Sequence, residues 1–180
     1  MSCKLSSNIT KDNCNYALSG VKAIYLLNYD NENAKIEESP TTKGISSITL
    51  PAGEKIHKID FVNDTASFSD ELATNGNGGK YRTHTVNFTI DEYGYTVLNQ
   101  DKALSLGRFV AIMQDKQGRC FVLGRNNGLT ATSFNYASGA ADADANGWTV
   151  VMAGTEIEMA KPLDSYDVIK DLVDDSIMIP

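Results

Sequence analysis

The only two histidines of the chain, His57 and His84, are the side chains best suited to acid–base chemistry near neutral pH. Each lies in a segment with the pattern of a β-strand, and neither has the HxH, HxxE or HExxH spacing of a metal site. No GxSxG motif marks an activated serine. We therefore expect both histidines to be structural and the chain to have no catalytic residues.

Two glycine-rich segments, 75–79 and 124–128, resemble phosphate-binding loops only superficially. Neither contains the Gly-Lys-Ser/Thr sequence of such a loop, and neither links a strand to a helix. Glycine beside asparagine between two strands is typical of a hairpin turn instead. The sequence therefore predicts turns at both places and no bound cofactor.

The strongest pattern for a ligand is Asp142-x-Asp144-x-Asn146-Gly147, in which side-chain oxygens alternate before a glycine. Calcium loops of the EF-hand type have this spacing. However, Ala153 occupies the position where such a loop needs a bidentate glutamate. The alternative is a tight polar turn in which the Asx side chains cap backbone amides. We favour the turn, and Asp142, Asp144 and Asn146 remain a calcium candidate.

Composition narrows the possible classes of protein. The three cysteines, Cys3, Cys14 and Cys120, are odd in number and lack CxxC spacing, so neither a disulfide framework nor a zinc site is expected. The net charge of −7 argues against a nucleic-acid reader, which normally has a basic surface. We expect neither a secretory leader nor a membrane span, because no apolar run approaches the ~20 residues that a span needs.

The candidate residues lie among short strands bounded by turns. Alternation is clearest over residues 80–90, which we expect to form the best hairpin arm of the chain. Residues 95–106 change to a helical period, and Gly107 follows where a C′ glycine belongs. The other predicted strands are 21–29, 45–50, 56–62, 65–72, 108–113, 119–123, 129–136 and 148–160, with a loop over 30–43 and a short helix over 164–173.

This layout predicts a mainly β fold, a β-sandwich or barrel with one flanking helix and extended terminal arms. We expect an N-terminal arm over residues 1–19, a β-sandwich or barrel domain over 20–163 and a C-terminal helix and tail over 164–180. At 180 residues, one core can sustain the whole chain.

Several phrases of the sequence resemble a known family. The first two are the predicted strand region 19–29, which follows Cys14, and the pair of predicted strands around Asp115-Lys116-Gln117-Gly118 that ends in Leu123-Gly124. The other two are the Asn127-Gly128-Leu129 turn and the segment 144–150. In this order they resemble tail-tube-related virion proteins of phages that infect Bacteroidetes, including crAss-like phages. The resemblance spans roughly residues 14–160 and rests on short, turn-rich motifs.

The resemblance implies a tube-like β-sandwich whose copies form rings around a DNA channel, and it brings no catalytic residues. A tail-tube subunit, a connector ring and a tail terminator all remain open. The implied partners are further copies of the chain, other ring, portal or tail proteins of the virion, and DNA that passes without specific binding. The implied location is the virion tail or neck, assembled in the host cytoplasm.

Free edges of strand-rich domains can join neighbouring subunits. We predict subunit contacts through the hairpin at 80–90 and through the apolar C-terminus. The predicted contact residues are Tyr81, Val86, Phe88, Ile177, Met178 and Ile179. The alternative function is a β-sandwich recognition module for a carbohydrate or a cell surface, with calcium at residues 142–147.

Overall fold

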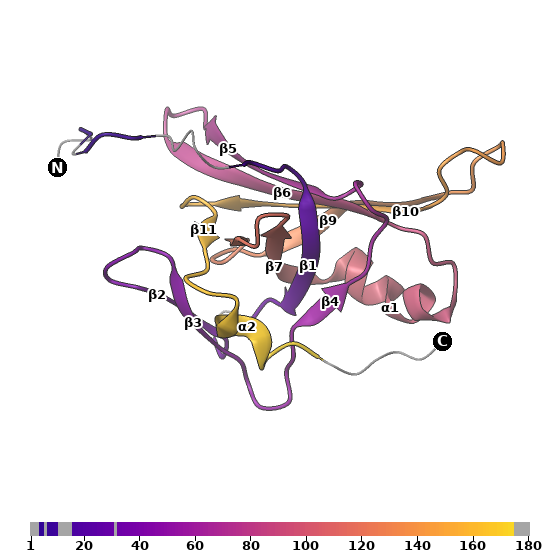
Figure 1. Cartoon of the computed structure of the whole chain (residues 1–180), viewed down its shortest axis with the longest axis horizontal. Helices are drawn as coiled ribbons and strands as arrows, with labels where there is room; N and C mark the ends of the chain where they lie inside the picture. Colours follow the sequence, from indigo (N-terminus) through magenta and orange to yellow (C-terminus); the bar gives the residue numbers. More distant parts are fainter. Residues whose placement is uncertain (1–3, 6, 11–15, 31, 175–180) are drawn as a thin grey trace.

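The computed structural model describes residues 4–5, 7–10, 16–30 and 32–174. They form a large antiparallel sheet, a small two-stranded sheet and two helices, so the predicted mainly β, sandwich-like fold is confirmed (Figure 1). The strands are β1 (Val21–Asn28), β2 (Lys35–Glu38), β3 (Ile45–Thr49), β4 (His57–Ile59), β5 (Ser67–Thr74), β6 (Lys80–Ile90), β7 (Arg108–Asp115), β8 (Cys120–Leu123), β9 (Leu129–Ala137), β10 (Gly147–Glu156) and β11 (Lys161–Pro162). The helices are α1 (Tyr95–Leu106) and α2 (Asp167–Lys170).

The large sheet folds over itself around β7. One edge of β7 pairs with β1 over nearly its whole length, and the other edge pairs with β8 and with the first residues of β9. Beyond β9 the sheet continues through β10 and β6 to β5. The strands β5, β6, β10 and β9 therefore form one layer, and β4, β1, β7, β8 and β11 form the layer that faces it.

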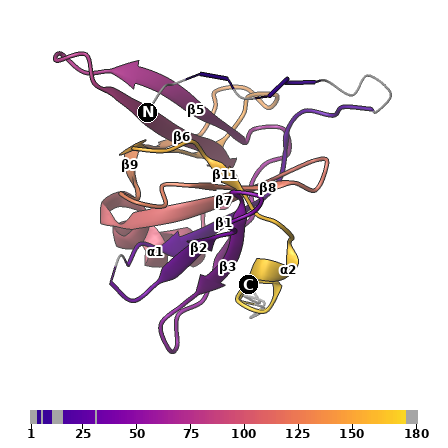
Figure 2. The same cartoon turned by 90° about the vertical axis from the view of Figure 1, so that its left-hand side faces the viewer.

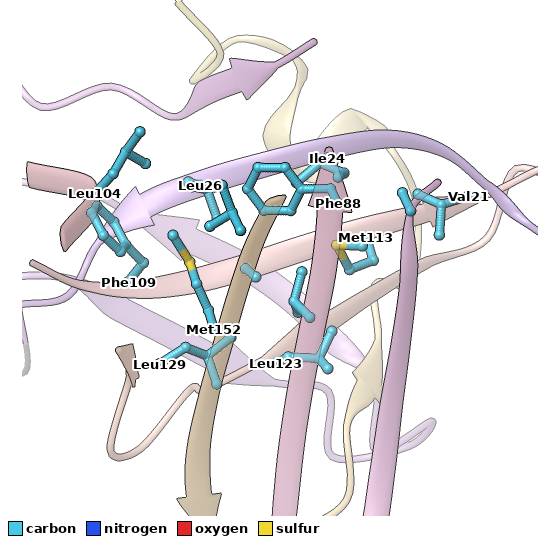
Figure 3. Packing of buried hydrophobic residues seen from close by; sticks show 14 of the residues in the cluster. Val21, Ile24, Leu26, Phe88, Leu104, Phe109, Met113, Leu123, Leu129 and Met152 are labelled. Atoms are coloured by element: carbon cyan, nitrogen blue, oxygen red, sulfur yellow. The ribbon is translucent and has the colours of Figure 1, made fainter. Parts of the chain in front are cut away.

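A hydrophobic core fills the space between these two layers (Figure 3). Alternate residues of β6 supply Val86, Phe88 and Ile90, because side chains two apart on a strand share a face. Met152 comes from β10 and Met113 from β7. The outward-facing residues of β6 are polar, so this layer has one apolar face and one solvated face.

A second core lies on the opposite face of β1 and β7. Tyr25, Leu27 and Ile112 point into it, and the hairpin of β2 and β3 and helix α2 cover it. Ile169 of α2 is fully buried there (Figure 2 shows α2 beside β3). The central strands β1 and β7 are consequently buried on both faces, which explains their nearly unbroken apolar sequences.

Helix α1 packs against β9 and places Val97 and Leu104 in the central core. The helix ends at Gly107, as expected, but for a different reason. The φ of Gly107 is −74°, so no left-handed cap is present. A Cβ at Gly107 would lie 2.3 Å from the carbonyl oxygen of Ala103, so close packing requires the glycine. Within the described residues, no helix is long and apolar enough to cross a membrane.

Several predicted strands have different bounds in the structure, since β4 covers only His57–Ile59 and β10 ends at Glu156, and two further segments differ more. Residues 35–38, expected to be part of a loop, form β2 and pair with β3. The predicted C-terminal helix is shorter than expected, because α2 spans only Asp167–Lys170 and the next residues bridge to Ile56. Short polar strands such as β2 lack the alternation that marks β6, so their pairing depends on tertiary contacts.

The core assignment of β6 predicts a stability difference between its two faces. Phe88→Ala should lower the free energy of unfolding by about 3–5 kcal/mol, because it leaves a cavity in the central core. Thr85→Ala, on the outward face of the same strand, should change it by no more than about 0.5 kcal/mol. Urea unfolding followed by circular dichroism measures both values, and equal effects would contradict the assigned faces.

Candidate functional site

His84 is buried, with 2% of its surface exposed, on the inward face of β6. The backbone N–H of Gly124 donates a hydrogen bond of 3.2 Å to its Nδ1. Its Nε2 lies 3.4 Å from Oδ1 of Asp70 and makes no hydrogen bond within the described residues. A buried histidine held between a turn and a carboxylate joins parts of the subunit.

Asp70 of β5 is the other half of this contact. Its Oδ1 accepts a hydrogen bond of 2.7 Å from Nε of Arg82, and its Oδ2 accepts one of 2.9 Å from the N–H of Ala160. Burial acts to raise the pKa of Asp70, but these hydrogen bonds outweigh burial and hold the pKa below its ordinary value of 3.8. Asp70 therefore stays ionised and ties β5 to β6 and to the chain after β10.

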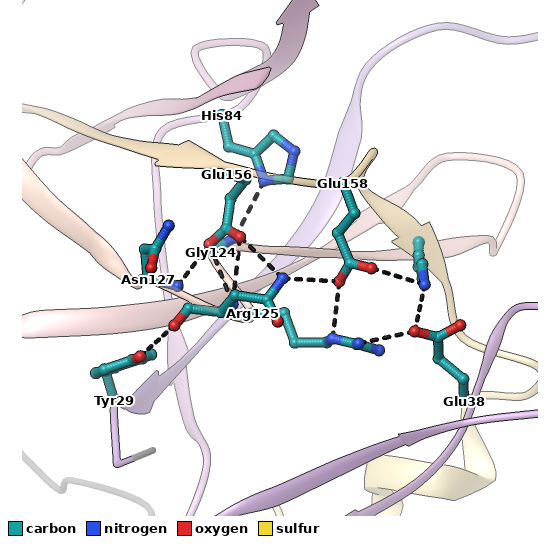
Figure 4. A network of polar contacts seen from close by, with 10 residues as sticks. Tyr29, Glu38, His84, Gly124, Arg125, Asn127, Glu156 and Glu158 are labelled. Atoms are coloured by element: carbon teal, nitrogen blue, oxygen red, sulfur yellow. Dashed lines mark hydrogen bonds and ion pairs between the residues drawn. The ribbon is translucent and has the colours of Figure 1, made fainter. Parts of the chain in front are cut away.

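Glu156, at the end of β10, organises the turn between β8 and β9. Its buried carboxylate accepts hydrogen bonds from the backbone N–H groups of Asn126 and Asn127, at 3.1 and 2.9 Å (Figure 4). The Asn126 side chain bridges Glu156 and Glu158, with donor–acceptor distances of 3.0 Å to each. The hydroxyl of Tyr29 donates to the carbonyl oxygen of Asn126. The glycine-rich segment 124–128 is thus a braced turn, as predicted.

Four side chains beside this turn form an ion-pair network. Arg125 contacts Glu38 at 2.7 Å and Glu158 at 2.8 Å, and Lys161 contacts both carboxylates as well. Burial acts to lower the pKa of Lys161, but its hydrogen bonds to Glu158 and Glu38 raise it overall. Two positive and two negative charges offset one another here, so the network fastens β2 to the sandwich and offers no net charge to a ligand.

A cavity of about 310 Å³ lies beside this network. Leu27 and Val110 line it together with Tyr29 and Arg125, whose polar atoms already contact Asn126 and the two glutamates. A ligand would have to displace an existing contact to bind through the Tyr29 hydroxyl. The buried Nη1 of Arg125, however, has no hydrogen-bond partner within the described residues, and Asn28, Asp30, Lys35 and Glu37 also line the cavity, so it retains polar groups that a ligand could contact.

His57 lies far from this arrangement in the fold. It occupies β4, its side chain is about half exposed, and its Nδ1 is 3.9 Å from Oδ2 of Asp174. His84 lies on β6, in the other layer of the sandwich. The structure does not bring the two histidines together into one site.

The predicted calcium candidate forms a turn between β9 and β10. Oδ2 of Asp144 accepts hydrogen bonds of 2.8 Å from the N–H groups of both Ala140 and Ala141. These bonds lower the pKa of Asp144. Gly147 has a φ of +132°, and a Cβ there would lie 2.5 Å from the carbonyl oxygen of Ile90. This geometry matches the expected polar turn. Among the described residues, no group of three or more His, Cys, Asp or Glu side chains is placed to hold a metal ion.

The predicted subunit-contact residues lie in three different settings. Tyr81 is partly exposed on the outward face of β6 and stays a candidate. Val86 and Phe88 are fully buried in the central core, so their assignment to a subunit contact is corrected. The alternation that singled them out marks the inward face of β6. Ile177, Met178 and Ile179 lie outside the described residues.

The strongest candidate for a subunit contact is the outer edge of β5, which sequence analysis missed. Among the described residues, β5 pairs only with β6. The N–H and C=O groups of Thr89 on β6 form hydrogen bonds on the side of β6 that faces β5. Asn87, two residues earlier, directs its backbone groups the same way and lies opposite Ser67 of β5. Because directions alternate along a strand, Phe68, Asp70, Leu72 and Thr74 direct their backbone groups away from the sheet.

This edge remains open to a further strand. The carbonyl oxygen of Asp70 accepts a bond from Arg82, and the other outward groups have no backbone partner within the described chain. The side chain of Leu72 is 61% exposed beside them. Unpaired edges of this kind pair readily with another strand.

The shifted pKa of Asp70 predicts a pH-dependent contribution to stability. Because the folded pKa lies below the unfolded value, the ionised carboxylate stabilises the fold above about pH 4, and this stabilisation is lost as pH falls through the folded pKa. Asp70→Asn should therefore lower the free energy of unfolding most near pH 7, with a difference that shrinks toward pH 3. Ser69→Ala, a neighbour that does not titrate, should show no such trend in urea unfolding.

The turn geometry predicts that calcium does not stabilise the protein. Thermal melts in chelator and in millimolar calcium should coincide, whereas calcium at one hundred times its Kd would add about 2.7 kcal/mol. Asp144→Ala should lower the melting temperature equally in both conditions, because it removes a cap from two amides. If calcium raised the melting temperature of the unmodified chain and Asp142→Ala abolished that increase, a metal site would be established.

No protein-family model matches this chain, and no curated protein matches its sequence. The resemblance to tail-tube-related phage proteins therefore stays a prediction.

Proposed function

We propose that this chain is a structural subunit whose copies join head to tail into a closed ring, as part of the tail tube or neck of a phage virion. The open edge of β5 carries this proposal. A strand edge with outward-directed N–H and C=O groups forms hydrogen bonds with any chain that is laid beside it. The fold itself leaves this edge without a strand partner among the described residues.

The shape of the long sheet supports a head-to-tail contact. The β5–β6 hairpin projects from one end of the molecule, and the loop between β9 and β10 projects from the opposite end (Figure 1). The two ends differ in sequence, so each meets a different surface of a neighbour. Contacts between unlike surfaces close into rings or continue as filaments.

The polar interior also supports a structural role. The buried charged groups Asp70 and Glu156 are bound by backbone and side-chain donors of the same subunit. His84 is enclosed as well. These groups stabilise the fold rather than face a substrate. The net charge of −7 suits a ring through which DNA passes without being held, since basic groups dominate affinity for phosphates.

The test is a matched pair of substitutions at Leu72. Leu72→Pro removes an N–H that points away from β6, so it blocks the edge without breaking an internal ladder bond. Leu72→Thr changes the side chain but keeps that N–H. We expect ring formation by the full chain and by Leu72→Thr, and at least a tenfold loss of assembly for Leu72→Pro. Light scattering and negative-stain electron microscopy measure assembly.

Thr74→Pro, at the next outward-directed N–H, repeats the test in case Leu72→Pro unfolds the chain. Thermal melting checks that each variant is folded. The ring should enclose a channel wide enough for duplex DNA, and gel shifts at physiological salt should show no DNA binding. A full chain that stays monomeric at high concentration, or rings that form equally well with both proline variants, would overturn the proposal.

A further inference from the structure

The N-terminal arm of residues 1–19, called the lead-in from here on, exposes apolar side chains that the described part of its own subunit does not cover. Leu5 is 86% exposed, Ile9 is 88% exposed, and Tyr16 is fully exposed. Its described residues, 4–5, 7–10 and 16–19, lie on the same side of the molecule as the β5–β6 hairpin (Figures 1 and 2). Leu5 and Ile9 are four residues apart, so an extended chain presents them on one face. Such a segment gains stability when another surface covers it.

The edge of β5 adjoins a groove of matching character. A cavity of about 460 Å³ lies between the root of the lead-in, β5 and the β7–β8 hairpin. Phe68 and Phe121 pack together in its wall, with ring centroids 5.4 Å apart, and Ala66 and Val21 also line it. Phe68 is also the first residue of β5 that directs its backbone groups outward. A strand added to this edge would thus gain backbone hydrogen bonds and an apolar surface together.

The charges of β5 decide which chain fits this edge. Two β5 strands could pair about a two-fold axis, but the registers that use nearly the whole strand place Glu71 opposite Glu71 or Asp70 opposite Asp70. Like charges directly opposite each other are destabilising. The lead-in carries two lysines, Lys4 and Lys11, against a single aspartate, Asp12. Asp70 is already paired with Arg82 in its own subunit, so the lysines of the lead-in complement Glu71, which a second β5 would meet with a like charge.

We propose that the lead-in of a neighbouring copy adds to the edge of β5 as a further strand, with Leu5 and Ile9 covering the apolar surface beside Phe68 and Leu72. This inference rests on the proposed head-to-tail assembly and names the two surfaces that meet. The donor lies N-terminal to β1 and the acceptor is β5, so each subunit gives one strand and receives one. This unlike pairing is what a ring requires.

A mixing experiment tests the two surfaces separately. One protein is the chain without residues 2–10, which keeps the acceptor edge and lacks the donor. The other is the full chain with Leu72→Pro, which keeps the donor and has a blocked acceptor. We expect each protein alone to be a monomer and an equimolar mixture to form a one-to-one pair, seen as a twofold rise in mass by light scattering.

The controls separate this inference from the ring proposal. Replacing Leu72→Pro by Leu72→Thr should restore self-assembly, and Leu5→Ser with Ile9→Ser in the full-length Leu72→Pro chain should abolish the pair. Normal rings of the chain without residues 2–10 would overturn the lead-in as donor and leave the ring proposal standing. So would the absence of a pair in the mixture while the full chain forms rings. A monomeric full chain would overturn the ring proposal itself.

Discussion

The fold depends on two central strands, β1 and β7, that are buried on both faces. Backbone groups in such strands reach no water, so both edges of β7 must be filled by neighbouring strands. β1 fills one edge, and β8 and β9 fill the other. Each face of this pair then needs its own cover. The layer of β6 and β10 covers one face, and the β2–β3 hairpin with α2 covers the other.

Because the central strands need partners on both edges and cover on both faces, the outer strands of the sheet differ in how many of their edges are paired. β6 and β10 use one face for the central core and keep the other in water, whereas β5 lies outermost and, among the described residues, pairs with a strand along one edge only. The network around Asp70, Arg82 and His84 fixes β5 against β6 even so. These contacts hold the open edge in place, and an edge that is already ordered loses little conformational entropy when a further strand binds to it.

The sequence pattern was sufficient to predict an element where the periodicity lies within a single segment. The alternation of residues 80–90 and the helical period of residues 95–106 gave the bounds of β6 and α1 as the structure has them. The same alternation places Val86, Phe88 and His84 on one face, which would have assigned all three to the core. One partner of His84, Asp70, lies directly opposite it on the adjacent strand β5 and follows from the hairpin register, whereas the other, Gly124, comes from the turn after β8 and was beyond prediction. The open edge of β5 was likewise unpredictable, since it depends on which strand lies outermost.

The acidic residues of β5 give this edge a selectivity that an apolar strand would lack. Proteins protect exposed edges with charges, including charged residues that point inward, as Asp70 does toward Arg82. At β5 these charges disfavour pairing with the β5 strand of another copy, because Asp70 would lie opposite Asp70, or Glu71 opposite Glu71, near the middle of the pair. Neither proline nor a bulge interrupts β5, so its hydrogen-bonding groups stay usable. An edge that repels itself yet keeps its ladder intact favours a different, less acidic segment, and such unlike pairing repeats from one subunit to the next.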